Sequence, residues 1–196
     1  MRKINNWANI KPQAEYSPLP AGGYVCRIMG AEMKSYNGRD GELIEKLAVS
    51  LDILEGDHKD HFAEDYRSQT FEDKRWGCVL SLSYPPEDAP ETDWRYGVLK
   101  AAVEAIEESN PGYHFDWDER KLKGKTVGCL FRSEEWEYNG KSGWKVRPFK
   151  LLDAQRVREG KFTQPKEKPL KKATNANYSE TASEFEAVDV DSDLPF

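Results

Sequence analysis

Several features that would place this chain in a familiar class are absent from its sequence. No apolar run approaches the roughly 18–20 residues that cross a bilayer, and no apolar segment follows the basic residues Arg2 and Lys3. We therefore expect neither a membrane span nor a secretory signal. Cysteine is scarce: Cys26, Cys78 and Cys129 are odd in number, far apart and set among apolar residues. We expect reduced, buried cytosolic thiols and no disulfide framework.

The chain is also poor in residues that could form a catalytic or metal site. It has three histidines, of which His58 and His61 share an acidic segment with no third His or Cys at ligand spacing. A solvated loop is the favoured interpretation of that segment. No Gly-rich loop opens a helix, and no nucleophile, histidine and acid can be grouped with one another. We expect no enzyme activity, no cofactor and no metal.

Charge is distributed very unevenly along the chain. The net charge is −6 and the mean hydropathy is −0.83. Residues 180–196 hold six acids and no Lys or Arg, so the rest of the chain carries 29 acids and 29 basic residues. A neutral body can still have a basic groove, and the overall acidity therefore does not exclude a nucleic-acid partner.

The composition changes sharply after Gly160. Residues 161–196 run through a basic part (161–172), a polar spacer (173–179) and an acidic end (180–196), with few apolar side chains. So little apolar area cannot offset the entropy of ordering. We predict a domain over residues 1–160 and a disordered linker and tip over residues 161–196.

The body shows mainly strand patterns. Residues 23–33 and 46–54 alternate around turn residues and predict a hairpin, and a third strand is expected within 61–69. Residues 94–109 have helical spacing between a cap and Asn110-Pro111-Gly112, and residues 71–92 are interpreted as an insertion or an extra turn of structure. Segments 125–138 and 143–157 predict a final hairpin. This order, with a helix between strands three and four, is that of a mainly β OB-fold, a five-stranded Greek-key barrel.

The final hairpin combines aromatic and basic side chains, which suit base stacking and phosphate contact. Alternation places Arg132, Trp136 and Tyr138 opposite the apolar side of the fourth strand. The candidate DNA-binding residues are Arg27, Tyr36, Arg39, Arg132, Trp136, Tyr138, Lys141, Trp144, Lys145 and Arg147. The alternative for the two tryptophans is a cross-strand pair that only stabilises the hairpin.

The last eight residues alternate acids and then end in Leu194, Pro195 and Phe196. This segment resembles the acidic C-terminal tip of bacterial and phage single-stranded DNA-binding proteins. The resemblance implies a partner pocket that takes the aromatic ring and reads the acids. The candidate partner-binding residues are Asp189, Asp191, Asp193, Leu194, Pro195 and Phe196.

The body resembles the phage and prophage single-stranded DNA-binding proteins over roughly residues 16–165. The similarity is carried, in order along the chain, by the segments 19–24, 107–112, 122–128, 139–141 and 157–162. It implies an OB-fold that coats and protects single-stranded DNA during phage replication and recombination, without catalysis. It also implies replication, recombination or repair proteins as partners of the tip, and a place in the bacterial host cytoplasm.

Two other functions stay open at this stage. One is a protein-recruitment adaptor on an OB-fold that binds no DNA, and the other is a phage recombination mediator or annealing protein. The sequence leaves open the oligomeric state and the preference between DNA and RNA.

Overall fold

The computed structural model describes residues 18–38 and 41–170. Its main element is a five-stranded antiparallel sheet in the order β3-β2-β1-β4-β5. The strands are β1 (Gly22–Asn37), β2 (Leu43–Ile53), β3 (Val79–Ser83), β4 (Thr126–Tyr138) and β5 (Lys141–Leu152). The helices are α1 (His61–Ser68), α2 (Trp94–Ser109), the 3-10 helix η2 (Glu119–Leu122) and α3 (Ala154–Arg158).

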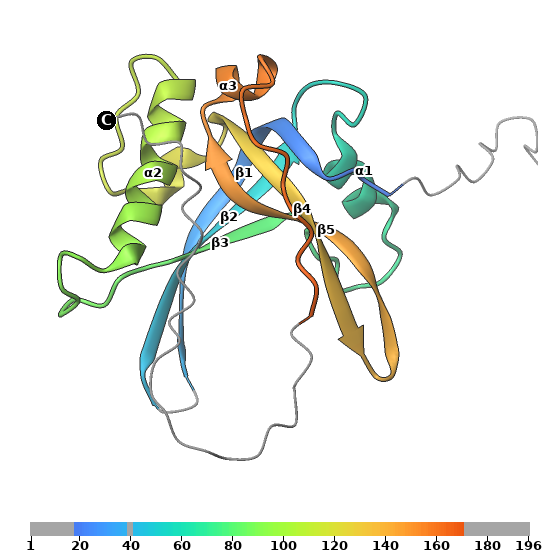
Figure 1. Ribbon diagram of the computed structural model, residues 1–196, viewed down its shortest axis with the longest axis horizontal. Helices are drawn as coiled ribbons and strands as arrows, with labels where there is room; N and C mark the ends of the chain where they lie inside the picture. The colour runs from blue at the N-terminus through green and yellow to red at the C-terminus, as the bar shows by residue number, and fades with distance from the viewer. Residues whose placement is uncertain (1–17, 39–40, 171–196) are drawn as a thin grey trace, which may run out of the picture.

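The sheet curls into a barrel around β1. This strand pairs with β2 along one edge and with β4 along the other, and its register with β2 shifts between Ile28 and Gly30. Such a bulge bends a strand and increases its twist, and the outer strands β3 and β5 come into contact. With α2 between β3 and β4, the order is that of the OB-fold. The predicted mainly β, five-stranded class is therefore confirmed (Figure 1).

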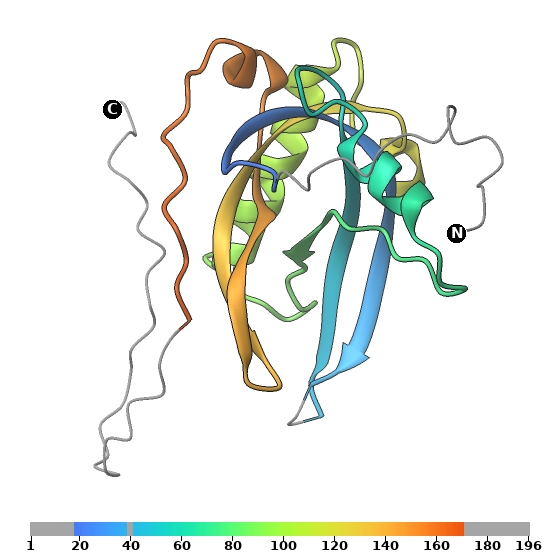
Figure 2. The same ribbon diagram turned by 90° about the vertical axis from the view of Figure 1, so that its right-hand side faces the viewer.

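Two long hairpins extend beyond the barrel. The β1–β2 and β4–β5 arms leave the same end of the molecule and splay apart, as Figures 1 and 2 show from two sides. Within the barrel, the alternation expected for β2 is present, since Leu47, Val49, Leu51 and Ile53 are all buried. Phe131 of β4 is fully buried in the same core.

Helix α2 has the bounds expected from its apolar spacing. The Asp93 carboxylate accepts the Arg95 N–H at 2.9 Å and caps its first turn. At the other end, the Asn110 side chain both donates to the Thr126 carbonyl and accepts the Thr126 N–H, at 2.7 and 3.0 Å. This double hydrogen bond fixes the end of α2 to the start of β4.

The prediction of a third strand within 61–69 is wrong, because these residues form α1. Phe62 and Tyr66 are one helical turn apart, and Phe62 is buried in the core. The residue before the helix, Asp60, provides no side-chain cap. Instead Asp52 Oδ1 on β2 accepts the N–H groups of Phe62 and Ile53, at 3.0 and 2.9 Å. An acceptor ten residues earlier leaves no local sign in the sequence.

The third strand lies instead within the segment that was interpreted as an insertion. Leu80 and Leu82 of β3 alternate into the core, so part of the segment 71–92 forms a strand of the barrel. The expected last strand over 143–157 is also too long, because β5 ends at Leu152. The Asp153 carboxylate then accepts the N–H groups of Gln155 and Arg156 and starts α3.

Residues 161–170 of the described chain contact the body at two places. Phe162 packs against the small outer cluster around Val25 and Leu130, and Lys168 pairs with β4. Residues 171–196, with the acidic tip, lie outside the described part of the chain. The division into a domain of 1–160 and a disordered segment of 161–196 therefore stays a prediction.

Replacing Asp52 tests how α1 is held. Asp52 is only 4% exposed, and Asp52→Ala would leave two N–H groups without their acceptor. We expect the free energy of unfolding to fall by about 1–3 kcal/mol, the usual range for an unsatisfied buried group. Urea unfolding measures this change.

Asp52→Asn is the matched control, because its amide oxygen can accept the same two hydrogen bonds. Burial raises the pKa of Asp52 above its ordinary value of 3.8. A raised folded-state pKa gives stability that is complete below 3.8 and is lost as the pH rises through the folded pKa. Relative to Asp52→Asn, the wild type should therefore lose stability with rising pH. Equal losses in the Ala and Asn variants would contradict the role of the residue 52 side-chain oxygen as the acceptor of these two hydrogen bonds.

Candidate nucleic-acid interface

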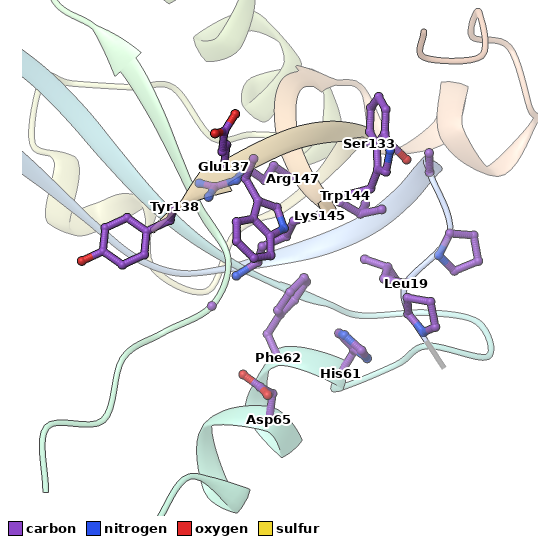
Figure 3. Close-up of a pocket in the computed structure, with 16 residues that line it drawn as sticks. Leu19, His61, Phe62, Asp65, Ser133, Glu137, Tyr138, Trp144, Lys145 and Arg147 are labelled. Carbon is purple, nitrogen blue, oxygen red and sulfur yellow. The ribbon is translucent and has the colours of Figure 1, made fainter. Parts of the chain in front are cut away.

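An open groove of about 820 Å³ runs between the β4–β5 arm and α1. The arm contributes one wall, and the other is formed by α1, by residues 18–21 before β1 and by Gly77 before β3. In Figure 3, the arm lies on one side of the groove and α1, with His61, Phe62 and Asp65, lies on the other, while the Tyr138 ring points away from α1. Five of the ten predicted DNA-binding residues line it, namely Trp136, Tyr138, Trp144, Lys145 and Arg147.

The register of the arm decides which side chains share a face. Trp136 lies opposite Gly143, and Trp144 lies opposite Glu135. Because directly paired residues point to the same face and neighbours along a strand alternate, the two indoles are on opposite faces. They do not form the cross-strand pair considered as an alternative. A two-stranded ribbon twists strongly. Both indole rings line the groove although they lie on opposite faces of the arm.

Two aromatic side chains of the arm, Tyr138 and Trp144, are largely exposed, whereas the Trp136 ring lies against Gly143, where an added Cβ would be 3.2 Å from the indole. Trp136, Tyr138 and Trp144 are 37%, 72% and 51% exposed. Exposing the apolar surface of an aromatic ring to water is unfavourable. Three such rings on one groove indicate a surface that a ligand could cover. The expected face shared by Arg132, Trp136 and Tyr138 agrees with the alternation along β4, whereas Trp144 lies on the other face.

The opposite wall is rigid because it belongs to the core. The Phe62 ring lies nearly parallel to that of Phe131, at 6.1 Å and 13°. His61 packs edge-on against Phe62, with ring centroids 4.9 Å apart. His61 is thus part of α1 and of the groove, and the predicted solvated loop is wrong for this residue.

The groove is not strongly basic. Lys145 and Arg147 line it together with the acids Asp65 and Glu137. Arg147 lies 3.9 Å from Glu134, which also makes a 2.9 Å ion pair with Arg132. Arg132 further covers the Phe149 ring, 4.7 Å from its centroid. The arginines are therefore partly engaged within the protein, whereas Lys145 makes no ion pair within residues 18–38 and 41–170.

The structure does not bring every predicted residue to this groove. Arg27 pairs with Thr126 at the start of β4, up to about 40 Å along that strand from Tyr138 at roughly 3.3 Å per residue. Tyr36 is near the tip of the β1–β2 arm, with Lys46 Nζ 5.4 Å from its ring centroid. Lys141 is exposed beside the arm's turn, and Arg39 lies outside the described residues.

Sequence reasoning missed the whole opposing wall. Its members outside the arm are Pro18, Leu19, Pro20, Ala21, His61, Phe62, Asp65 and Gly77. The helical spacing of Phe62 and Tyr66 was the available signal. The segment before β1 carried no such signal, since its place is set by long-range packing and by the Tyr24 hydroxyl, which donates to the Pro20 carbonyl at 2.9 Å.

The cysteines lie in the core and not on the groove. All three cysteines are free and fully buried, and burial raises the pKa of the Cys26, Cys78 and Cys129 thiols. A thiol kept protonated in this way is a poor nucleophile. Over the same residues, no group of three His, Cys, Asp or Glu side chains could hold a metal ion. No helix found there is long and apolar enough to cross a membrane.

Comparison with known proteins adds little to the structural description of the groove. No protein-family model and no curated protein matches the chain. A solved structure of yeast RPA bound to ssDNA is similar, with 11% sequence identity and a TM-score of 0.31, over 82% of this chain and 92% of that one. So low a TM-score carries no inference about function. The resemblance to phage single-stranded DNA-binding proteins stays a prediction.

Proposed function

We propose that the protein binds single-stranded DNA along the groove between the β4–β5 arm and α1. The observation that carries this proposal is the gathering of exposed Trp136, Tyr138 and Trp144 beside Lys145 on that groove. Aromatic rings stack on bases of any sequence, and OB-folds commonly use this hairpin for oligonucleotides. The phage setting, with coating of single strands during replication and recombination, is part of the proposal and has the sequence resemblance as its support.

The charges of the groove indicate that stacking contributes more than phosphate contacts. One stacked base is worth about 1–3 kcal/mol, and three rings are available. Against this, two cations and two carboxylates line the groove. If two phosphates are neutralised, the slope of log K against log salt is only about −1.4 for a single strand. The protein should then tolerate salt better than a strongly basic binder.

The first prediction concerns the rings. Trp136→Ala and Trp144→Ala should each weaken binding to oligo-dT by about 1–3 kcal/mol, measured by fluorescence anisotropy of a labelled oligonucleotide. Trp117→Ala is the matched control, because Trp117 is 71% exposed but does not line the groove. Unchanged affinity together with a lower melting temperature in the two groove variants would make these rings structural.

The second prediction separates the basic residues. Lys145→Ala should reduce the magnitude of the salt slope by about 0.7, the value of one phosphate contact on a single strand. Arg132→Ala should change it less, because Arg132 is engaged by Glu134 and Phe149. Titrations at several salt concentrations measure both slopes. A larger change for Arg132→Ala would show that Arg132, and not Lys145, is the main phosphate contact.

The acidic tip is proposed to recruit replication, recombination or repair proteins and to compete with DNA for the groove. The support is its sequence alone: six acids that end in Leu194, Pro195 and Phe196. Deleting residues 189–196 should raise the affinity for oligo-dT at low salt, and screening should remove the gain at high salt. A gain that persists at high salt, or no gain at all, would contradict this competition.

Adding oligo-dT distinguishes the proposed function from its two alternatives. A recruitment adaptor without DNA binding would leave the tryptophan fluorescence unchanged when oligo-dT is added. An annealing protein would bind oligo-dT and also accelerate the pairing of complementary strands. No described feature favours either over simple binding of single strands.

A further inference from the structure

Strand β4 has a free edge beside the groove. β1 pairs with it only from Thr126 to Phe131, whereas β4 continues to Tyr138 with β5 on its other side. Beyond Phe131, the backbone groups that point away from β5 belong to every second residue, including Ser133 and Glu135. An open edge of this kind is a template for another strand.

The segment 166–170, which we call the strap, occupies part of this edge. Lys168 donates its N–H to the Ser133 carbonyl at 2.8 Å, and its own carbonyl accepts the Glu135 N–H at 2.9 Å. The pairing is parallel, and the Leu170 N–H adds a hydrogen bond to Glu135 Oε2 at 3.0 Å. Figures 1 and 2 show the chain after α3 running along the β4–β5 arm.

The single proline of the strap, Pro169, suits an edge strand. Backbone groups alternate along a strand, so that Lys168 faces β4 while Glu167 and Pro169 face away from it. Pro169 thus lacks an N–H only where none is needed. It also biases the preceding Lys168 towards an extended conformation. The composition of these residues is typical of a linker. Their spacing instead fits an edge strand that pairs with β4 and has no Pro169 N–H on its outer side.

The charges of the strap and of the edge are complementary. The free part of β4 carries Glu134, Glu135 and Glu137, and Lys168 Nζ lies 3.9 Å from Glu134. Lys166 and Lys168 are both exposed. Ser133, whose carbonyl accepts the strap's hydrogen bond, also lines the groove. The strap residues themselves do not line the groove, so the strap lies on the β4 edge next to it.

We propose that the strap is a sixth, edge strand that extends the DNA-binding groove by covering the acidic edge of β4 and presenting Lys166 and Lys168 to phosphates. This inference rests on the proposed function for its binding role. The docking of the strap on β4 is independent of that function. The proposal assigns a binding role to residues that composition alone places in a linker.

A proline scan in the full-length chain tests the docking. Lys168→Pro removes the N–H that donates to Ser133, and the Glu135 amide should then exchange with solvent about five- to tenfold faster, the equilibrium value of one net hydrogen bond. Glu167→Pro is the matched control, because the N–H it removes faces away from β4, and it should leave the Glu135 amide protected. Equal exchange in the wild type and in Lys168→Pro would overturn the docking.

Oligo-dT titrations test the binding role. With the two strap lysines added to the two groove cations, the expected slope is about −2.8. Lys168→Ala keeps the backbone pairing and should reduce its magnitude by up to about 0.7, since Lys168 also lies 3.9 Å from Glu134. Lys168→Pro releases both lysines and should reduce it by up to about 1.4. Binding by Lys168→Pro that is as tight as that of Lys168→Ala, or tighter, would overturn the binding role of the strap. A wild-type chain that binds no single strand would overturn the proposed function and this role together, while the amide exchange still decides the docking.

Discussion

The six-residue ladder between Gly22–Arg27 and Thr126–Phe131 determines most of what is distinctive in this molecule. Because β1 also pairs with β2 and bends at its bulge, it holds the two halves of the barrel together. Because it begins only at Gly22, after Pro18 and Pro20, the rest of β4 leaves the barrel as half of a two-stranded arm. The aromatic wall of the groove and the edge covered by the strap both follow from that early end of the ladder.

The groove joins a rigid wall to an exposed one. Phe62 is fixed by the core and by the Asp52 carboxylate that accepts its N–H, whereas Trp144 and Tyr138 stand on an arm supported mainly by its own pairing. An open site with aromatic faces and nearly balanced charge suits a flexible, stackable ligand better than a rigid duplex, whose bases are already stacked on one another. This balance distinguishes the site from a basic groove that would take any polyanion.

Local patterns in the sequence predicted the parts of the fold that depend on local chemistry. The alternation around Val49, the helix capped by Asp93 and the turn of the β4–β5 arm have the expected positions, although β5 ends earlier than expected. The prediction failed where a distant residue decides the structure. Asp52 starts α1 from another element, and β3 was hidden by the prolines that follow it. For the site, composition identified the arm, but only the register showed that Trp144 lies on the face opposite Trp136.

The most direct test of the central claim is a titration of the intrinsic tryptophan fluorescence with oligo-dT, compared with a duplex of the same length, at two salt concentrations. The account predicts saturable quenching by the single strand, weaker binding of the duplex, and only a modest loss of single-strand affinity at the higher salt concentration. Absence of quenching, or binding of both ligands with equal affinity and a steep dependence on salt, would contradict it.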